Sequence, residues 1–243
     1  MKFMMTLIAL PLALAACGKS GTAADTAAPA APVAAAAAPA GQQWQDVVAK
    51  TAEGYRMGNP DAPVKLVEYG ARLCPGCRQL AETAFTPLMD NYVSTGKVSF
   101  EFRDFLIHGP AELALATLGQ CGGPGTFFPI LEQTYANQPS FIDKWQAMPP
   151  AQQATAGKTP PQIVQTYANA IGAVDFVKQR GIPEAKAQAC MKDVAAIEAI
   201  AAVTAKASND GTVTGTPTVI LNGKPLDNPT WENLEKALKA AGA

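Results

Sequence analysis

The feature that most constrains this chain is a pair of cysteines, Cys74 and Cys77, between a strand-length apolar run and a helical stretch. The apolar run covers residues 64–69, and its length and character predict a central buried strand. Apolar side chains at helical spacing follow over residues 78–92, and a second strand is predicted over 98–103. The order strand, helix, strand predicts an α/β fold in which the two strands lie parallel.

The next hundred residues contain no convincing strand. Their apolar side chains recur every three or four positions and predict helices over residues 111–120, 126–136, 161–179, 183–192 and 194–208. A polar, proline-rich loop is predicted at 148–161, and a short helix near 44–51.

Strand character returns at residues 218–221, followed by an Asn-Gly turn, a short return strand and a last helix over 230–241. The sequence thus predicts a split α/β domain, formed by residues 42–108 and 209–243, with an all-helical insertion at 109–208.

Charge and composition exclude several classes of function. The chain has 243 residues, with 19 Lys and Arg against 20 Asp and Glu. Without a basic excess, neutralisation of phosphates cannot drive nucleic-acid binding, so no nucleic-acid partner is expected. One His and five Cys leave little material for an imidazole-rich metal centre.

The N-terminus reads as an export signal. Residues 1–16 carry Lys2 and then a short apolar run, which is too short to span a membrane and is typical of a signal peptide. The run ends in Leu14-Ala15-Ala16-Cys17, which resembles the bacterial lipobox, where the cysteine is lipidated. The alternative is an ordinary signal peptide with an incidental Cys17. Residues 17–41 are rich in Ala and Pro and are interpreted as a mobile tether, or as a spacer with no mechanical role.

Four cysteines remain once Cys17 is set aside. The Cys-x-x-Cys spacing of Cys74 and Cys77 is usually redox-active or metal-binding. Cys121 and Cys190 would then form a second pair, whose disulfide is worth roughly 4.4 kcal/mol in the chain-entropy model. Two buried free thiols are the alternative, and a Cys₄ zinc site is a third reading. Zinc is disfavoured because Cys121 and Cys190 have no close cysteine partner in the sequence.

Three elements in order resemble the thioredoxin superfamily, and within it the DsbA-like envelope oxidoreductases. They are Glu68 in the first strand, Cys74-Pro75-Gly76-Cys77 at a helix start, and Gly215-Thr216-Pro217-Thr218 before the late strand, with the helical insertion between. The resemblance covers the whole mature domain and implies a thioredoxin fold with an all-helical insertion. It also implies that Pro217 is cis and lies against the cysteine pair, whereas an ordinary trans proline opening a strand is the alternative. Neither an organic cofactor nor a metal is expected.

The expected chemistry is dithiol–disulfide exchange. Only a thiolate attacks a disulfide, and a helix N-terminus lowers the pKa of Cys74, which makes Cys74 the expected nucleophile and Cys77 the resolving cysteine. Glu68 is a candidate proton relay for Cys77, with an edge-exposed or salt-bridged Glu as the alternative. Substrate is expected beside Thr216 and Pro217, and at Pro75 and Gly76 of the motif.

One residue departs from the family pattern. Strong oxidases of this family usually carry His where this chain has Gly76. Arg72 and Arg78 flank the motif and could partly replace that charge, or could be solvated surface residues. The only histidine, His108, is expected to have a structural or surface role.

The resulting hypothesis is a lipid-anchored, periplasm-facing thiol:disulfide oxidoreductase that introduces disulfides into exported proteins. Its expected partners are cysteine-containing exported proteins, a membrane redox partner and, through the lipid, the membrane itself. Gly18 is not the Asp that retains many lipoproteins in the inner membrane, which favours the outer membrane. The alternatives are a reductase or isomerase fed by a membrane electron donor, and a non-catalytic binding lipoprotein of thioredoxin fold.

Overall fold

The computed structural model describes residues 30–243. The expected signal peptide at 1–16, Cys17 and the first part of the expected tether therefore lie outside the described residues. Across residues 30–243, no helix combines the length and the apolar character that a membrane span requires.

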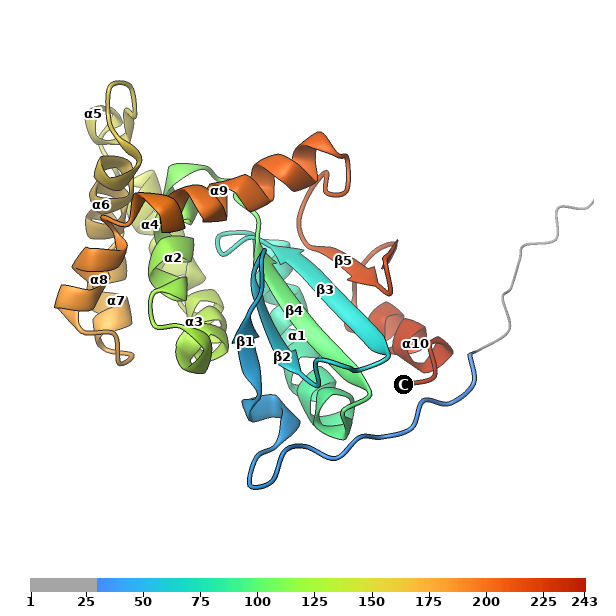
Figure 1. The fold of residues 1–243 in the computed structure, drawn as a ribbon. Helices are drawn as coiled ribbons and strands as arrows, with labels where there is room; N and C mark the ends of the chain where they lie inside the picture. The colour runs from blue at the N-terminus through green and yellow to red at the C-terminus, as the bar shows by residue number, and fades with distance from the viewer. Residues whose placement is uncertain (1–29) are drawn as a thin grey trace, which may run out of the picture.

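A six-stranded sheet in the order β1-β2-β4-β3-β5-β6 forms the centre of the molecule (Figure 1). Its strands are β1 (Val48–Lys50), β2 (Tyr55–Gly58), β3 (Val64–Gly70), β4 (Val98–Asp104), β5 (Thr218–Leu221) and β6 (Lys224–Pro225). β3 pairs with β4 in parallel, as the sequence predicts, and all other pairs are antiparallel. The sheet is therefore mixed, and β3 lies near its middle, between β4 and β5.

The N-terminal part of the domain differs from the prediction. In place of a helix near residues 44–51, a 3₁₀ turn, η1 (Trp44–Asp46), leads into the antiparallel strands β1 and β2. These strands have only three and four residues, so the alternation of buried and exposed side chains is too short to recognise in the sequence. Tyr55 and Met57 nevertheless point into the core from β2.

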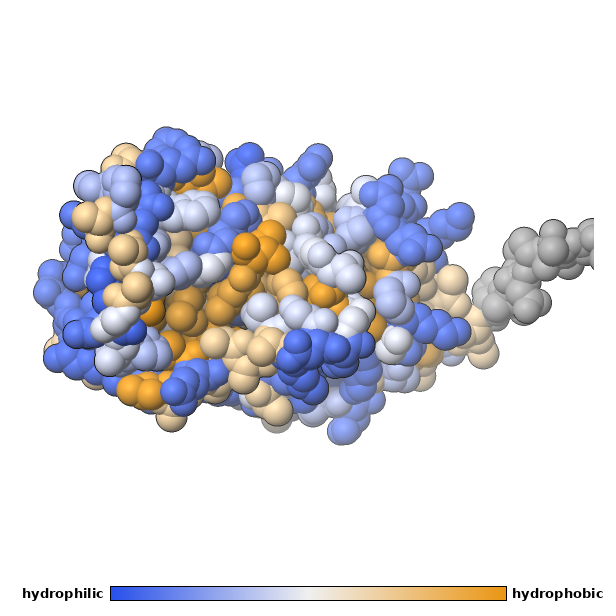
Figure 2. Space-filling model, turned by 90° about the horizontal axis from the view of Figure 1, so that it is seen from above, coloured by the Kyte–Doolittle hydropathy of each residue, from blue (hydrophilic) through white to orange (hydrophobic). Residues whose placement is uncertain are grey.

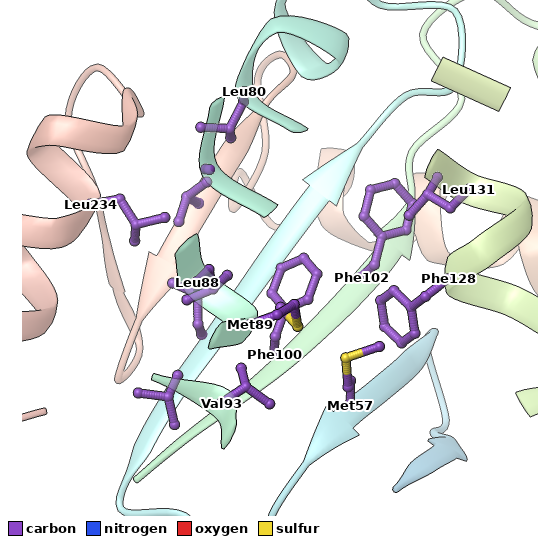
Figure 3. Close-up of a cluster of buried hydrophobic side chains, with 14 of the residues drawn as sticks. Met57, Leu80, Leu88, Met89, Val93, Phe100, Phe102, Phe128, Leu131 and Leu234 are labelled. Carbon is purple, nitrogen blue, oxygen red and sulfur yellow. The ribbon is translucent and has the colours of Figure 1, made fainter. Parts of the chain in front are cut away.

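Helices cover both faces of the sheet. α1 (Pro75–Asn91), α3 (Pro124–Ala136) and α10 (Trp231–Ala240) pack on one face, and α9 (Val194–Asn209) packs on the other. In the first of these layers, Phe100 and Phe102 of β4 meet Leu88 of α1 and Leu131 of α3 (Figure 3). Side chains alternate along β3, so Leu66 and Glu68 face this layer, whereas Val67 and Tyr69 face α9. This alternation puts Glu68 beneath α1.

The insertion between β4 and β5 is helical throughout and has a hydrophobic core of its own. Besides α3 and α9 it contains α2 (Pro110–Gln120), α4 (Gln138–Gln146), α5 (Pro150–Gln153), α6 (Pro160–Ala170), α7 (Ala173–Lys178) and α8 (Glu184–Cys190). The single helix predicted at 161–179 is wrong, because Gly172, at φ 75°, separates α6 from α7. α4 was not predicted, and the one-turn α5 interrupts the loop predicted at 148–161. Each has a proline in its first turn, Pro139 and Pro150, where proline is well tolerated.

Two further features concern the edges of the domain. A disulfide joins Cys121, just after α2, to Cys190, the last residue of α8, with an S–S distance of 2.02 Å. The second feature is the segment 30–36, which belongs to the expected tether but lies along the domain (Figure 1). The amide of Val33 donates to Gly242 O at 2.8 Å, and that of Ala36 donates to Thr95 O at 3.0 Å, next to η2 (Val93–Thr95). The amide of Ala30 donates to Ala240 O at 2.9 Å, a carbonyl at the end of α10 that has no partner within the helix.

Candidate active site

Cys74 and Cys77 lie at the start of α1, close to the end of β3. Cys74 is the N-cap of the helix, and Pro75 occupies the first turn. Proline is tolerated there because the backbone N–H that it lacks would have no partner within the helix. Cys74 has 7% of its surface exposed and Cys77 has none. The first sulfur is therefore within reach of another molecule, whereas the second is sealed inside the protein.

A distant part of the chain completes the site. The Thr216–Pro217 peptide bond is cis, and Thr216 O lies 3.4 Å from Cys74 Sγ. A Cβ carbon added to Gly76 would stand 3.3 Å from Pro217 Cδ and 3.8 Å from Cys74 Sγ. The structure thus brings Cys74 and Gly76 together with Thr216 and Pro217, which lie far from them in the sequence. The trans alternative for Pro217 does not hold.

The two thiols differ greatly in acidity. A hydrogen bond from the Cys77 thiol, helped by the Thr216 side chain and by the backbone amides of Cys77 and Gly76, outweighs burial and lowers the pKa of Cys74 to about 5. Burial has the opposite effect on Cys77 and raises its pKa, and donation to Cys74 raises it further. At neutral pH the reduced site therefore pairs a Cys74 thiolate with a Cys77 thiol.

Glu68 is a buried acid beneath this pair. It stands in register with Phe102 of β4 and Val219 of β5, and 8% of its surface is exposed. Its Oε1 atom has no hydrogen-bond partner among the described residues. Burial, with a smaller contribution from the negative charge of Cys74, raises the pKa of Glu68 to about 8. Neither alternative from the sequence, an edge-exposed or a salt-bridged Glu68, fits this position.

Two insertion residues that the sequence analysis did not identify hold the loop that precedes Cys74. Gln138 Nε2 donates to the carbonyl oxygens of Arg72 and Cys74, each at 3.0 Å. Glu112 Oε1 accepts the amide of Leu73 at 2.9 Å. Both side chains are almost completely buried, with 1% exposed. No sequence signal could have assigned them this role, because their contacts depend on how the insertion docks against the loop.

Of the two arginines that flank the motif, Arg78 lies at the surface, whereas Arg72 does not. Arg72 is fully buried and its Nε lies 2.6 Å from Asp104 Oδ1, so its charge is neutralised by a carboxylate and it is not a solvated surface residue. Arg78 is about one-third exposed and pairs with Glu82 at 3.2 Å. His108 donates its backbone amide to Glu112 Oε2 at 2.8 Å, and its ring lies 3.2 Å from the same oxygen, which raises the pKa of His108.

A metal at the cysteines finds no support in this geometry. Cys121 and Cys190 are bonded to each other, which contradicts the Cys₄ zinc reading. Among residues 30–243, no group of three or more His, Cys, Asp or Glu side chains is placed to hold a metal ion.

Comparison with known proteins places the chain among redox proteins. The thioredoxin family model matches residues 50–240. A probable disulfide bond formation protein D from Bacillus cereus is 25% identical over 185 residues, covering 75% of this chain and 76% of that protein. A crystal structure of a protein-disulfide isomerase from Novosphingobium aromaticivorans superimposes with a TM-score of 0.72 at 27% identity, covering 78% of this chain and 98% of the other.

The insertion is shared with a known fold as well. The structure of Wolbachia pipientis alpha-DsbA1 matches with a TM-score of 0.60 at 16% identity, covering 77% of this chain and 89% of that one. The match spans both the sheet and the insertion. With the family model covering most of the sequence, this chain belongs to the thioredoxin family and is a thiol:disulfide oxidoreductase of the DsbA-like kind.

Proposed function

We propose that this protein introduces disulfide bonds into exported proteins in the cell envelope, with Cys74 as the exchanging sulfur. The observation that carries the proposal is the contrast in acidity between Cys74 and Cys77. A Cys74 thiolate that is stabilised by the Cys77 thiol and by helix amides favours the reduced form of the pair. A couple whose reduced form is stabilised is a strong oxidant, and therefore donates its disulfide to substrates.

The reaction begins with the oxidised pair. A substrate thiolate attacks Cys74 Sγ, the Cys74–Cys77 bond breaks, and Cys77 leaves with the electron pair. Glu68 gives its proton to the Cys77 sulfur, because at neutral pH a carboxyl with a pKa of about 8 is mostly protonated. A second substrate thiolate then attacks the substrate sulfur of the mixed disulfide and releases the Cys74 thiolate. The substrate has lost two electrons, which a disulfide-bearing membrane partner takes up in the next half-cycle.

The substrate segment is proposed to lie along Thr216 and Pro217. Pro75 and Gly76 are exposed beside Cys74, so an extended chain could reach the sulfur there. Figure 2 shows the molecule from above, from the side toward which β3 and β4 point in Figure 1. Hydrophobic side chains gather near the middle of this face. Ile107 is one of the large hydrophobic residues that remain exposed, at 43%. An unfolded exported protein offers apolar segments that suit such a surface.

The location in the envelope is part of the proposal. The disulfide between Cys121 and Cys190 suits an oxidising compartment. The lipobox-like sequence at Cys17 would anchor the protein in a membrane, facing the periplasm, with Gly18 favouring the outer membrane.

A second candidate is an isomerase or reductase fed by a membrane electron donor. The similarity to the 27% identical protein-disulfide isomerase from Novosphingobium aromaticivorans favours it, as does Gly76 in place of the family's His. Measurement of the reduction potential of the Cys74–Cys77 couple in glutathione buffers separates the two. A value near −120 mV supports the oxidase, and a value near −270 mV overturns it in favour of the reductase. Oxidation of a reduced model protein and reduction of insulin are measured alongside, and inactivity in both assays would leave a non-catalytic binding protein.

A further inference from the structure

A small cavity lies between the sheet, α1 and α3, next to Glu68. Its volume is about 20 Å³, which is room for one water molecule. Its wall is mostly apolar and includes Phe102 and Leu131, which face each other in Figure 3. Three polar side chains interrupt this wall, namely Glu68 from β3 and Glu132 and Tyr135 from α3.

The three polar groups lie at different depths. Glu68 and Tyr135 are buried, with 8% and 3% exposed, and neither Glu68 Oε1 nor the Tyr135 hydroxyl has a hydrogen-bond partner within residues 30–243. Burying two polar atoms without hydrogen bonds on one cavity wall costs free energy, unless a polar molecule lies between them. Glu132 is exposed at the surface, yet burial of its carboxyl raises its pKa.

Helical spacing explains why both α3 groups reach the cavity. Leu131 and Glu132 lie three and four positions after Phe128, and Tyr135 lies four and three positions after them, so these residues share one side of α3. Phe128 and Leu131 pack into the core (Figure 3), and Glu132 and Tyr135 accompany them toward α1 and the sheet. The insertion thus adds two polar side chains to a space in which the thioredoxin-like half places one, Glu68.

Cys77 needs a route for its proton. Its side chain has no exposed surface, so a proton that reaches or leaves its sulfur must pass through neighbouring groups. Glu68 is the acid next to it, but Glu68 is itself buried and must be reprotonated after each exchange.

We propose that the cavity is the proton passage of the exchange reaction, with Glu132 as its solvent end and the Tyr135 hydroxyl as the group that orients a water molecule toward Glu68. The inference rests on the proposed relay role of Glu68 and extends it to the insertion. When Cys77 leaves as a thiolate, Glu68 gives up a proton to it, the water protonates Glu68, and Glu132 replaces the proton from solvent. Reoxidation runs the same steps in reverse, and no electron moves along this path.

The charged and titratable groups around Glu68 are few. α1 contributes Cys74 and Cys77, and α3 contributes Glu132 and Tyr135. The charges of Arg72 and Asp104 also act on Tyr135, but they are paired with each other. The cavity faces of β5 and α10 are apolar, through Val219 and Leu234. Glu132 is therefore the carboxyl group among these that connects the cavity to solvent.

The test uses Glu132→Gln in the full protein, which removes the titrating group but keeps the shape. Single-turnover reduction of the oxidised enzyme by a reduced cysteine peptide is followed from pH 5 to pH 9. We expect the rate to fall about tenfold, less than the full effect of a general acid because water can still enter, with an altered pH profile. The reduction potential and the alkylation rate of Cys74 should not change, since a proton route affects rates alone. Formate or imidazole added as a small proton carrier should restore the rate.

Three further variants make the outcome decisive. Glu132→Asp should retain most of the rate, and Tyr135→Phe should slow the reaction severalfold. Glu198→Gln, at an exposed position of α9, is a matched control. Wild-type rates and pH profiles in both Glu132→Gln and Tyr135→Phe would overturn the passage. If Glu68→Gln is slow in the same experiment while those two variants are not, the inference fails but the proposed function stands. If Glu68→Gln is also unaffected, the relay role of Glu68 fails as well.

Discussion

The molecule holds two cysteine pairs whose environments are opposite. Cys74 and Cys77 are three positions apart at the start of one helix, whereas Cys121 and Cys190 are 69 positions apart and join the ends of α2 and α8. The second pair is the more exposed of the two, since Cys77 has no exposed surface and Cys74 only 7%. Access to solvent therefore does not explain which pair exchanges. The difference lies in the charge environment of one sulfur.

That environment has a simple origin. Cys74 is surrounded by groups that favour its thiolate, namely the Cys77 thiol, the Thr216 side chain and the backbone amides at the helix start. The bridge in the insertion instead closes a long loop, and it stabilises the folded protein by lowering the entropy of the unfolded chain. The first pair thus serves the chemistry and the second serves stability, and three experiments test this division.

The largest expected effect follows from replacing the exchanging sulfur. Cys74→Ser should abolish thiol–disulfide exchange, because no thiolate remains that a substrate can reach. Cys77→Ser should instead accumulate mixed disulfides on Cys74, since the resolving thiol is gone. Mass spectrometry of the trapped species measures both. Adducts that form on Cys77 in preference to Cys74 would reverse the roles proposed for the two residues.

A smaller effect, on stability, is expected at the other pair. Replacing Cys121 and Cys190 together by Ser should lower the free energy of unfolding by about 4 kcal/mol, from the loop of about 70 residues that the bridge closes. Exchange by Cys74 should persist, because the insertion contacts that hold its loop come from Gln138 and Glu112. Denaturant unfolding of the double variant, compared with the wild type, measures the loss.

The same double variant can contradict the division in two ways. Alkylatable thiols at both positions in protein isolated from the envelope would show that no lasting bridge exists there. A large loss of exchange with little loss of stability would mean that the second pair takes part in the chemistry.

The sequence predicts the site better than its surroundings. The thioredoxin fold, the helical insertion and the burial of Glu68 follow from residue types in order, since each depends on local pattern or on a short motif. The β1 and β2 strands were missed because they are too short to show alternation, and α4 because Pro139 resembles a breaker. Long-range contacts are beyond local pattern altogether.

Arg72 shows this limit most clearly. Its position beside the motif suggested a role at the thiolate, but docking of the insertion and of β4 buries it completely against Asp104. Glu132 and Tyr135 are the converse case. They read as ordinary helix residues in the sequence, and only the packing of α3 beside α1 brings them to the cavity next to Glu68.

The smallest effect is expected from Gly76→His, which adds charge to the reactive pair without touching either sulfur. The Cβ position is 3.8 Å from Cys74 Sγ, so an imidazole there can donate to the thiolate. One charge-assisted hydrogen bond is worth roughly 1.5–3 kcal/mol. For a two-electron couple this corresponds to a rise of roughly 30–65 mV in the reduction potential. Glutathione-buffered equilibria of the variant and the wild type measure the change.

Gly76→Ala is the matched control, because any side chain at this position stands 3.3 Å from Pro217 Cδ and requires a small adjustment there. If His and Ala shift the potential equally, the effect comes from this contact and not from the added donor. An unchanged or lower potential with His would mean that the Cys77 thiol and the helix amides already set the thiolate, with Arg78 as the nearest remaining charge in the sequence. Arg72 could not then be invoked, because its charge is already paired with Asp104 in the interior. Cys74 would then owe its low pKa to the Cys77 thiol, the Thr216 side chain and the backbone amides, and the contrast with the structural bridge would rest on the position of Cys74 at the helix start.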